Sequence, residues 1–284
     1  MKKRNLALAF AFSCTLGLAA CGGGHDLGAE IGVSDPEIRF LNASATSPAL
    51  DFYLNGALLA SQSNLAYRSV GGYQTFNNGT TTASLNQAGT TTQLATAAFS
   101  AANGHRYTAV AFPGLASGAV SNPAGDATAS LTTSEFVIDD PFDKGILNDQ
   151  ARLRFLNGSY NAQAVDVYVV PNTTTDLSAI SPTFSNVAYG AAAPASGQDS
   201  IYLDGGNYHI EITANASKTA IYDSGTVNLD NNDDLLITSV PETGAGAVLP
   251  NSLRVVLANG QSNTSQDLPN AQTANTAGSP AVAP

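Results

Sequence analysis

The sequence predicts an all-β protein built from two tandem, antiparallel β-sandwich domains. Only 12% of its 284 residues are charged, and the long Lys- and Glu-rich periodic stretches typical of surface helices are missing. Short runs of alternating apolar residues, separated by Gly, Asn and Asp, occur in their place, which is the pattern of strands and turns. A block of sequence also occurs twice, which indicates two copies of one structural unit.

The internal repeat extends over fifteen positions without a gap. Residues 39–53 and 154–168 share eight identities and both begin with Arg-Phe-Leu-Asn. Ser-Asn-Leu-Ala-Tyr at 63–67 then returns as Ser-Asn-Val-Ala-Tyr at 185–189, seven residues later than the first offset predicts. The second copy therefore carries an insertion around 171–182, which we expect to be a loop. Each copy has about 100 residues, a length that suits a β-sandwich.

Residues 1–20 have the plan of a signal peptide. Lys2, Lys3 and Arg4 precede an apolar run that is too short for a membrane span, which needs about 20 apolar residues. The run ends in Leu-Ala-Ala before Cys21, and three glycines follow. This resembles the lipobox of bacterial lipoproteins, in which the cysteine thiol accepts the lipid. We expect acylation at Cys21, in preference to ordinary secretory cleavage or an uncleaved anchor.

The mature chain would have no free thiol and a strongly acidic balance. Cys14 lies in the segment that would be removed and Cys21 would carry lipid, so neither a disulfide nor a thiolate metal site is expected. Removal of three of the 11 basic residues leaves 8 against 22 acidic ones, a formal net charge of −14. Such a surface repels phosphate, which argues against nucleic acid as a partner.

Strands are predicted where apolar and polar side chains alternate, at 50–54 and 165–169. Asp51 and Asp166 fall on the face opposite the apolar side chains, at equivalent positions of the two copies. We interpret them as structural residues that accept backbone N–H bonds at the strand entry or pair with a nearby arginine, Arg39 or Arg154. The positions predicted to face the cores are Leu50, Phe52, Leu54, Val165, Val167 and Val169.

A turn into another strand is predicted at 204–208, Asp-Gly-Gly-Asn-Tyr. We expect Gly205 or Gly206 to take the positive φ that such a turn needs. The Tyr208 hydroxyl is expected to bond to nearby backbone, as a corner tyrosine of a sandwich does.

The predicted organisation follows from these segments. The short linker suggests that the two domains lie end to end with limited freedom. The C-terminal segment has almost no large apolar residue and is expected to be disordered. The segments are a signal peptide at 1–20, a lipid-anchored tether at 21–36, a first sandwich at 37–140, a linker at 141–151, a second sandwich at 152–258 and a disordered tail at 259–284.

Calcium ligands are conceivable near the domain junction, at Asp139, Asp140 and Asp143, because calcium binds several carboxylate oxygens. Asp also clusters in turns for local reasons, since its side chain bonds to nearby backbone. No glutamate lies at a characteristic spacing. We therefore favour turn chemistry and expect neither a metal nor a cofactor.

No catalytic set is indicated, because His25 lies in the tether and His105 and His209 occupy positions of the two copies that do not correspond. Neither a Gly-x-Ser-x-Gly elbow nor a His-Glu-x-x-His helix occurs, so an enzyme is disfavoured. The chain has no Trp, which excludes a tryptophan platform for sugars. Tyr160 and Tyr202 stay as candidate ligand contacts.

The paired pattern Arg-Phe-Leu-Asn, Asp-x-Tyr, Asn-x-Ala-Tyr and Tyr-Thr-Ala-Val resembles the DUF4397 family, a domain of unknown function in secreted bacterial proteins, often in tandem. The resemblance covers 37–140 and 152–258. In the second copy Leu235 stands where the first has Tyr107. The resemblance implies Ig-like sandwiches and an extracytoplasmic location, and it implies no catalytic residues.

Together these features predict a lipoprotein of the cell envelope that acts as a non-enzymatic spacer or interaction module. Its expected partners are the membrane, through the lipid, and an unknown envelope protein or glycan. The outer membrane is the expected location, because Gly22 follows the cysteine where an Asp commonly signals inner-membrane retention. The alternatives are an envelope-polymer hydrolase and a glycan- or peptide-binding module.

Overall fold

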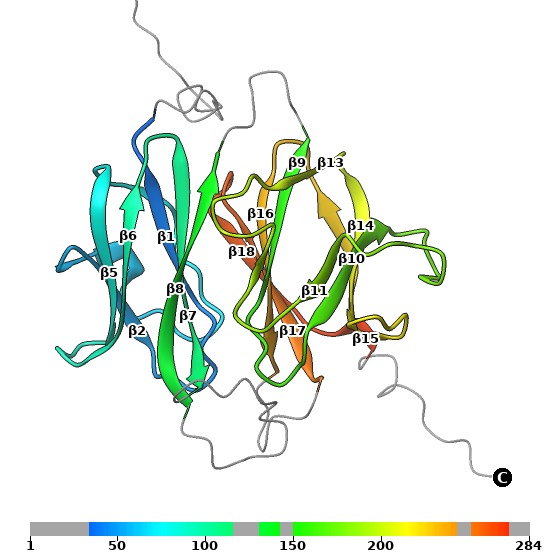
Figure 1. Ribbon diagram of the computed structural model, residues 1–284, viewed down its shortest axis with the longest axis horizontal. Coiled ribbons are helices and arrows are strands. Elements are labelled where there is room, and N and C mark those ends of the chain that lie inside the picture. Colours follow the sequence, from blue (N-terminus) through cyan, green and yellow to red (C-terminus); the bar gives the residue numbers. More distant parts are fainter. Residues whose placement is uncertain (1–33, 116–130, 143–149, 243–250, 273–284) are drawn as a thin grey trace, which may run out of the picture.

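Four β-sheets stacked side by side make up the protein (Figure 1). The computed structural model describes residues 34–115, 131–142, 150–242 and 251–272. The all-β class and the β-sandwich architecture predicted from the sequence are confirmed. Within the described residues, no helix is long and apolar enough to cross a membrane.

The first sandwich contains β1 to β8 and the short 3-10 helix η1 (Ala60–Gln62). Its inner sheet has the order β4 (Gln74–Thr75), β1 (Glu37–Asn42), β7 (His105–Leu115), β8 (Leu131–Pro141). Its outer sheet has the order β3 (Ala57–Leu58), β2 (Leu50–Leu54), β5 (Gly79–Gln87), β6 (Gln93–Ala101).

The second sandwich repeats this strand order. Its inner sheet runs β12 (Ala192–Ala193), β9 (Ala151–Asn157), β16 (Asp234–Pro241), β17 (Leu253–Asn259), β18 (Thr264–Leu268), and β13 (Ile201–Leu203) also pairs with β9. Its outer sheet runs β11 (Phe184–Val187), β10 (Val165–Pro171), β14 (Gly206–Ala214), β15 (Ala220–Leu229). The sequence repeat is thus a repeat of topology.

The inner sheets are mixed, whereas the sequence predicts antiparallel sandwiches. β1 pairs in parallel with β7, and β9 pairs in parallel with β16. The remaining pairs are antiparallel. Strand direction leaves no mark in the alternation of side chains, so this feature could not be predicted from periodicity.

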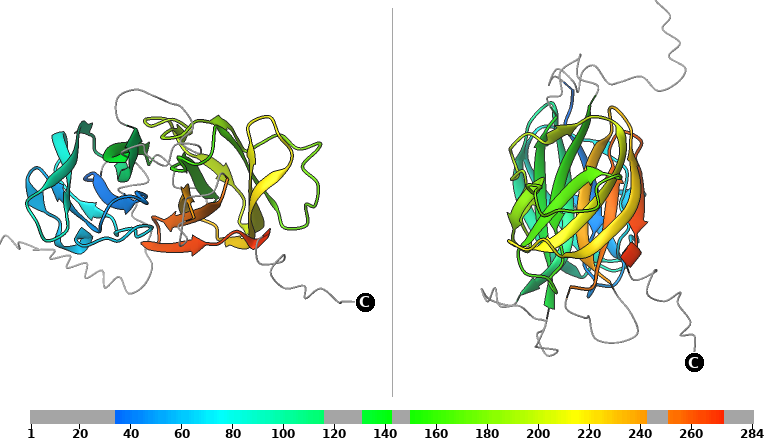
Figure 2. Two further views of the ribbon diagram at one scale, coloured as in Figure 1. Left: turned by 90° about the horizontal axis from the view of Figure 1, so that it is seen from below. Right: turned by 90° about the vertical axis from the view of Figure 1, so that its right-hand side faces the viewer.

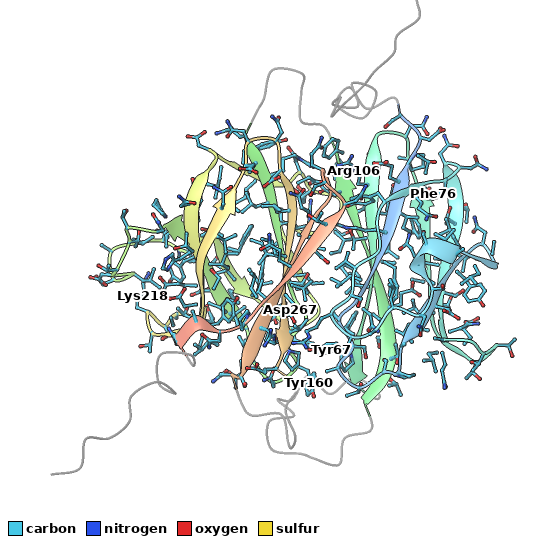
Figure 3. The ribbon with its side chains drawn as sticks, turned by 180° about the vertical axis from the view of Figure 1, so that it is seen from behind. Tyr67, Phe76, Arg106, Tyr160, Lys218 and Asp267 are labelled. Carbon is cyan, nitrogen blue, oxygen red and sulfur yellow. The ribbon has the colours of Figure 1, made fainter. Side chains whose placement is uncertain are left out.

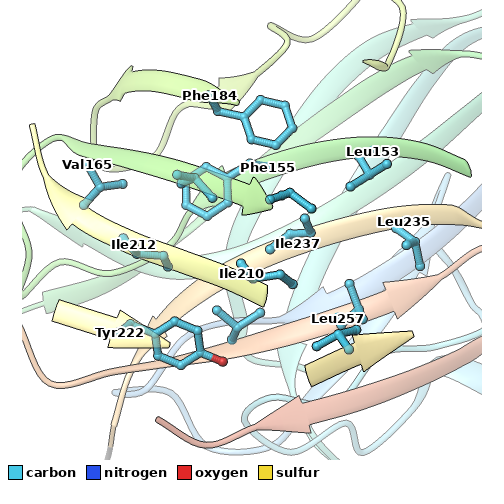
Figure 4. Close-up of a cluster of buried hydrophobic side chains, with 14 of the residues drawn as sticks. Leu153, Phe155, Val165, Phe184, Ile210, Ile212, Tyr222, Leu235, Ile237 and Leu257 are labelled. Atoms are coloured by element: carbon cyan, nitrogen blue, oxygen red, sulfur yellow. The ribbon is translucent and has the colours of Figure 1, made fainter. Parts of the chain in front are cut away.

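Each sandwich has its own core between its inner and outer sheets. In the first, Phe40 stacks on Phe52 with ring centroids 5.3 Å apart. The second is packed by aliphatic side chains around Phe155 and Tyr222 (Figure 4). The predicted core-facing positions of β2 and β10 are all buried in these two clusters, so the predicted core face of each strand is confirmed. The opposite face of β10 is buried as well, so β10 is not the half-buried strand that the sequence predicts.

The two sandwiches lie side by side, with their inner sheets facing each other (Figure 2), so the predicted end-to-end arrangement is wrong. A third apolar cluster joins the inner sheets, and we call it the interface cluster. The short linker from β8 to β9 is compatible with both the end-to-end and the side-by-side arrangement. The side-by-side arrangement is favoured because it buries apolar side chains between the two inner sheets. The interface cluster consists of Leu41, Ala43, Val110, Ile138, Leu156, Leu236, Val240, Val256 and Ala258.

The tail predicted to be disordered from 259 onward is ordered over part of its length. β18 pairs with β17 along its whole length. Asp267 then bonds to Arg254 of β17 and pairs with Arg68 of the first sandwich. Asn270 donates to the Ile221 carbonyl and accepts from the Asp223 N–H, both on β15. The segment therefore ties the inner sheet to its own outer sheet and to the neighbouring sandwich.

The predicted turn at 204–208 is formed, but its glycines are required for a reason other than a positive φ. Neither Gly205 nor Gly206 takes a positive φ. A Cβ on Gly205 would lie 2.5 Å from the Asn231 side chain, so the close approach requires the glycine. The Tyr208 hydroxyl donates to the Asp204 carbonyl at 2.8 Å, which confirms the predicted corner tyrosine.

Candidate functional site: an arginine–aromatic ladder between the sandwiches

Guanidinium groups and aromatic rings alternate across the junction of the two sandwiches, and we call this row the arginine–aromatic ladder. The Arg39 and Arg106 guanidiniums flank the Tyr73 ring, at 4.5 and 5.1 Å from its centroid. Phe142 lies between Arg106 and Arg152, at 3.9 and 4.5 Å. Planar guanidinium groups stack on ring faces and favour such sites when they are desolvated. The ladder consists of Arg39, Tyr73, Arg106, Phe142, Arg152 and Tyr202, the last at 6.0 Å from Arg152.

Carboxylates neutralise the arginines from the sides of the ladder. Arg106 donates to Glu37 at 2.8 Å and to Asp234 at 3.0 Å. Arg152 donates to the other oxygen of Asp234 at 3.1 Å and to Asp140 at 2.9 Å. Asp234 of the second sandwich therefore bridges an arginine from each sandwich.

The charged groups at the centre of the ladder are buried, so each needs a partner of opposite charge. Arg152 is fully buried and Asp234 is 4% exposed. Burial alone would raise the pKa of Asp234, but the charges of Arg152, Arg106 and Arg39 outweigh it and hold the pKa below its usual range. Removing one member of such a set leaves an uncompensated buried charge, at a cost of about 3 to 5 kcal/mol.

A cavity of about 10 Å³ lies beside the ladder, with Arg39, Thr108, Asp140, Arg154 and Asp234 in its wall. That volume holds one water molecule. The cavity is too small for an organic substrate. Among the described residues, no group of three or more His, Cys, Asp or Glu side chains could hold a metal ion. The residues around the cavity can fix the geometry of the junction.

Two tyrosines tie the other end of the junction together, and their contacts are reciprocal. Tyr67 of the first sandwich donates its hydroxyl to the Pro241 carbonyl of the second, and Tyr189 of the second donates to the Pro113 carbonyl of the first. Figure 3 shows Tyr67 at the opposite end of the strands from Arg106. Tyr67 and Tyr189 are repeat equivalents, so the two sandwiches meet through the same surface of each copy.

Asp139 and Asp140, two of the three candidate calcium ligands, point away from each other on β8. Adjacent residues of a strand point to opposite faces. Asp139 accordingly lies against the His105 ring, with Oδ1 2.7 Å from Nδ1, whereas Asp140 accepts hydrogen bonds from Arg152 and Arg154. Asp143 lies outside the described residues, as does Cys21.

The repeated aspartates, Asp51 and Asp166, accept backbone N–H bonds, the first of the two structural roles predicted for them. Asp51 accepts backbone N–H bonds from Asn64 at 2.7 Å and Gly89 at 2.8 Å. Asp166 accepts the corresponding bonds from Asn186 at 2.7 Å and Ala216 at 2.9 Å. Arg39 instead donates to Thr108, so it is not the ion partner of Asp51.

Most of the ladder was missed in the sequence, although one signal was present. Arg39 of the ladder and Arg154, which lines the cavity beside it, stand inside otherwise apolar strands, where a buried cation requires partners. Those partners come from strands far away in the sequence, which no local pattern reveals. Tyr202 lies over Arg152 and donates to Asp199. Its ring and hydroxyl are therefore engaged within the protein.

Part of the chain matches a known family of protein domains. No curated protein matches the chain. Residues 36–168 match the model of a family described as a domain of unknown function, DUF4397. The match begins just before β1 and ends within β10, so it spans the first sandwich and enters the second. The resemblance to DUF4397 is thereby confirmed for residues 36–168.

Proposed function

We propose that the chain is a lipid-anchored protein of the bacterial outer membrane that serves as a rigid, non-enzymatic spacer or interaction module. The observation that carries the proposal is the union of the two sandwiches through the interface cluster and the buried ladder. A stiff body holds its ends at a fixed separation, as a spacer or a platform for another envelope component must.

The absence of an enzymatic role is supported by how the titratable side chains are used. Nδ1 of His105 lies against Asp139, and Nδ1 of His209 lies 3.3 Å from Asp223. Both pairs lie on strand surfaces, and the ladder carboxylates are occupied by arginines. Each histidine–aspartate pair joins neighbouring strands, β7 to β8 and β14 to β15, so it serves the sheet.

The lipid anchor is tested by Cys21→Ser, because that thiol is the acyl acceptor in the proposal. We expect the variant to lose acyl mass and to leave the membrane fraction. Continued sedimentation with membranes at unchanged mass would contradict the anchor. Separation of inner and outer membranes then tests the proposed location.

Rigidity is tested by the distance between spin labels in a secreted chain that carries Cys21→Ser. Labels at Leu58→Cys and Thr226→Cys report on the two outer sheets, since Leu58 is 44% exposed and Thr226 is exposed on β15. We expect a narrow distribution of distances. The pair Leu58→Cys and Ala98→Cys, within one sandwich, gives the width due to the labels alone. A broad or two-peaked distribution for the first pair would contradict a rigid module.

A further inference from the structure

The two sandwiches carry opposite charges at the same pair of strand positions. In the first, Glu37 of β1 lies beside Arg106 of β7 in the parallel register. In the second, Arg152 of β9 lies beside Asp234 of β16. The repeat makes Glu37 equivalent to Arg152, and the two registers make Arg106 equivalent to Asp234. Each pair is therefore the charge-reversed copy of the other.

Arg106 and Asp234 also contact each other across the junction, with Nη1 and Oδ2 3.0 Å apart. Equivalent residues touch one another only close to a twofold relation between two copies. The reciprocal bonds of Tyr67 and Tyr189 obey the same relation. If two copies of the first sandwich were joined in this manner, Arg106 would lie against Arg106. Two copies of the second sandwich would place Asp234 against Asp234.

The apolar contacts and the tyrosine bonds of the junction include equivalent residues of both sandwiches, whereas Asp140 of the first adds a carboxylate that bonds to Arg152 and Arg154 of the second. Leu41 and Leu156 are equivalent and both belong to the interface cluster. Both tyrosines bond to a proline carbonyl, which either copy supplies. Like charges facing each other in a dry interface are strongly disfavoured. Discrimination therefore rests on the charged positions.

We propose that Glu37, Arg106, Arg152 and Asp234 are the specificity-determining residues of the pairing face, which admits a sandwich of the opposite type and rejects one of its own type. The occupant of each face is the other sandwich of the same chain. Copies of the chain at high concentration then stay closed and do not join through like faces. The inference depends on the junction alone and not on the envelope role proposed above.

Charge reversal in the full-length chain tests the proposal. Arg106→Asp faces Asp234 with a like charge, and Asp234→Arg faces Arg106 with one. We expect each to lower Tm by about 6 to 12 °C. The fourfold reversal Glu37→Arg, Arg106→Asp, Arg152→Glu and Asp234→Arg restores the pairs among these four residues. It is made in a background of Asp140→Asn and Asp199→Asn, because both carboxylates would otherwise face Glu at position 152. Relative to that background, we expect the fourfold reversal to recover more than half of the loss. Arg68→Asp, at a partly exposed ion pair with Asp267 in the same junction, is the matched control and should change Tm less than either reversal.

A charge-free variant separates discrimination from simple attraction. Arg106→Met with Asp234→Leu removes the contact without creating like charges, and we expect it to lose less than half as much Tm as either single reversal. This variant and the fourfold reversal are informative even where the single reversals fail to fold. The proposal is overturned if the charge-free pair loses as much as a single reversal, or if the fourfold variant loses the sum of the separate effects.

Discussion

Glu135 of β8 shows how one residue couples stability to pH. Neither carboxyl oxygen has a hydrogen-bond partner within the described residues. Burial raises the pKa of Glu135 from an ordinary value of 4.5 to about 8. The folded protein therefore holds a proton at neutral pH that the unfolded chain releases. Because the folded pKa is the higher one, the stabilising contribution is complete below pH 4.5 and is lost as the pH rises to about 8.

We expect Glu135→Gln to be more stable than the parent protein at pH 8 and to show a flatter pH dependence, because the amide has no proton to lose. Urea unfolding at pH 5, 6.5 and 8 measures the difference. Glu242→Gln, at a partly exposed pair with Arg254, is the control. If the free energy of unfolding of Glu135→Gln changed with pH between 5 and 8 as steeply as that of the parent protein, other groups would set the pH dependence.

The carboxylates of β8 give a second expectation at the residue scale. Asp139 and Asp140 are directed to different partners, a histidine and two arginines. A calcium ion bound to the folded state would raise stability by about 1.4 kcal/mol at tenfold excess over Kd. We expect no such response to millimolar calcium. Calorimetric titration of metal-stripped protein decides, and saturable binding that Asp140→Asn abolishes would reverse this expectation.

Among the elements, β18 is a strand because it pairs with β17, and its own sequence does not predict a strand. Its side chains are mostly exposed, and its sequence, Thr-Ser-Gln-Asp-Leu, has no apolar alternation. It is held by main-chain bonds to β17 and by the contacts of Asp267 and Asn270. A strand of this kind covers the edge of the inner sheet.

We expect a chain that ends at Asn263 to lose hydrogen-exchange protection along β17 and to unfold at lower urea concentration, because the edge of β17 is uncovered. A chain that ends at Gln272 keeps β18 and is the matched control. Equal protection of β17 in the two chains would show that β18 adds nothing to the sheet.

How far the sequence predicts an element depends on whether its cause is local. β2 and β10 were predicted together with their buried faces because alternation records burial directly. β18 was not, because its cause is a neighbouring strand. The insertion of the second copy was predicted as a loop, but its packing against β10 was not predicted. Leu177 and Ile180 cover Tyr168 on the outer face of β10, which leaves β10 buried on both faces.

At the scale of the whole molecule, the arrangement of the two copies is the feature that the sequence did not predict. The repeat gives two units, and a short linker is compatible with several placements of them. The choice comes from the interface cluster, whose members look like ordinary core residues in the sequence, and from the ladder, which draws on distant strands. Buried apolar side chains at such a junction couple the stabilities of the two sandwiches.

Cooperative unfolding follows from this coupling. Phe52→Ala, in the first core, should cost about 3 to 5 kcal/mol, and Val167→Ala, in the second, should cost less because fewer atoms are removed. If opening one sandwich exposes the interface cluster and uncovers the ladder charges, the other cannot keep its native surface. We therefore expect each variant to shift one common transition in scanning calorimetry, with equal calorimetric and van't Hoff enthalpies. Two separable transitions, each moved by only one of the substitutions, would show that the junction contributes too little to bind the sandwiches into a single folding unit.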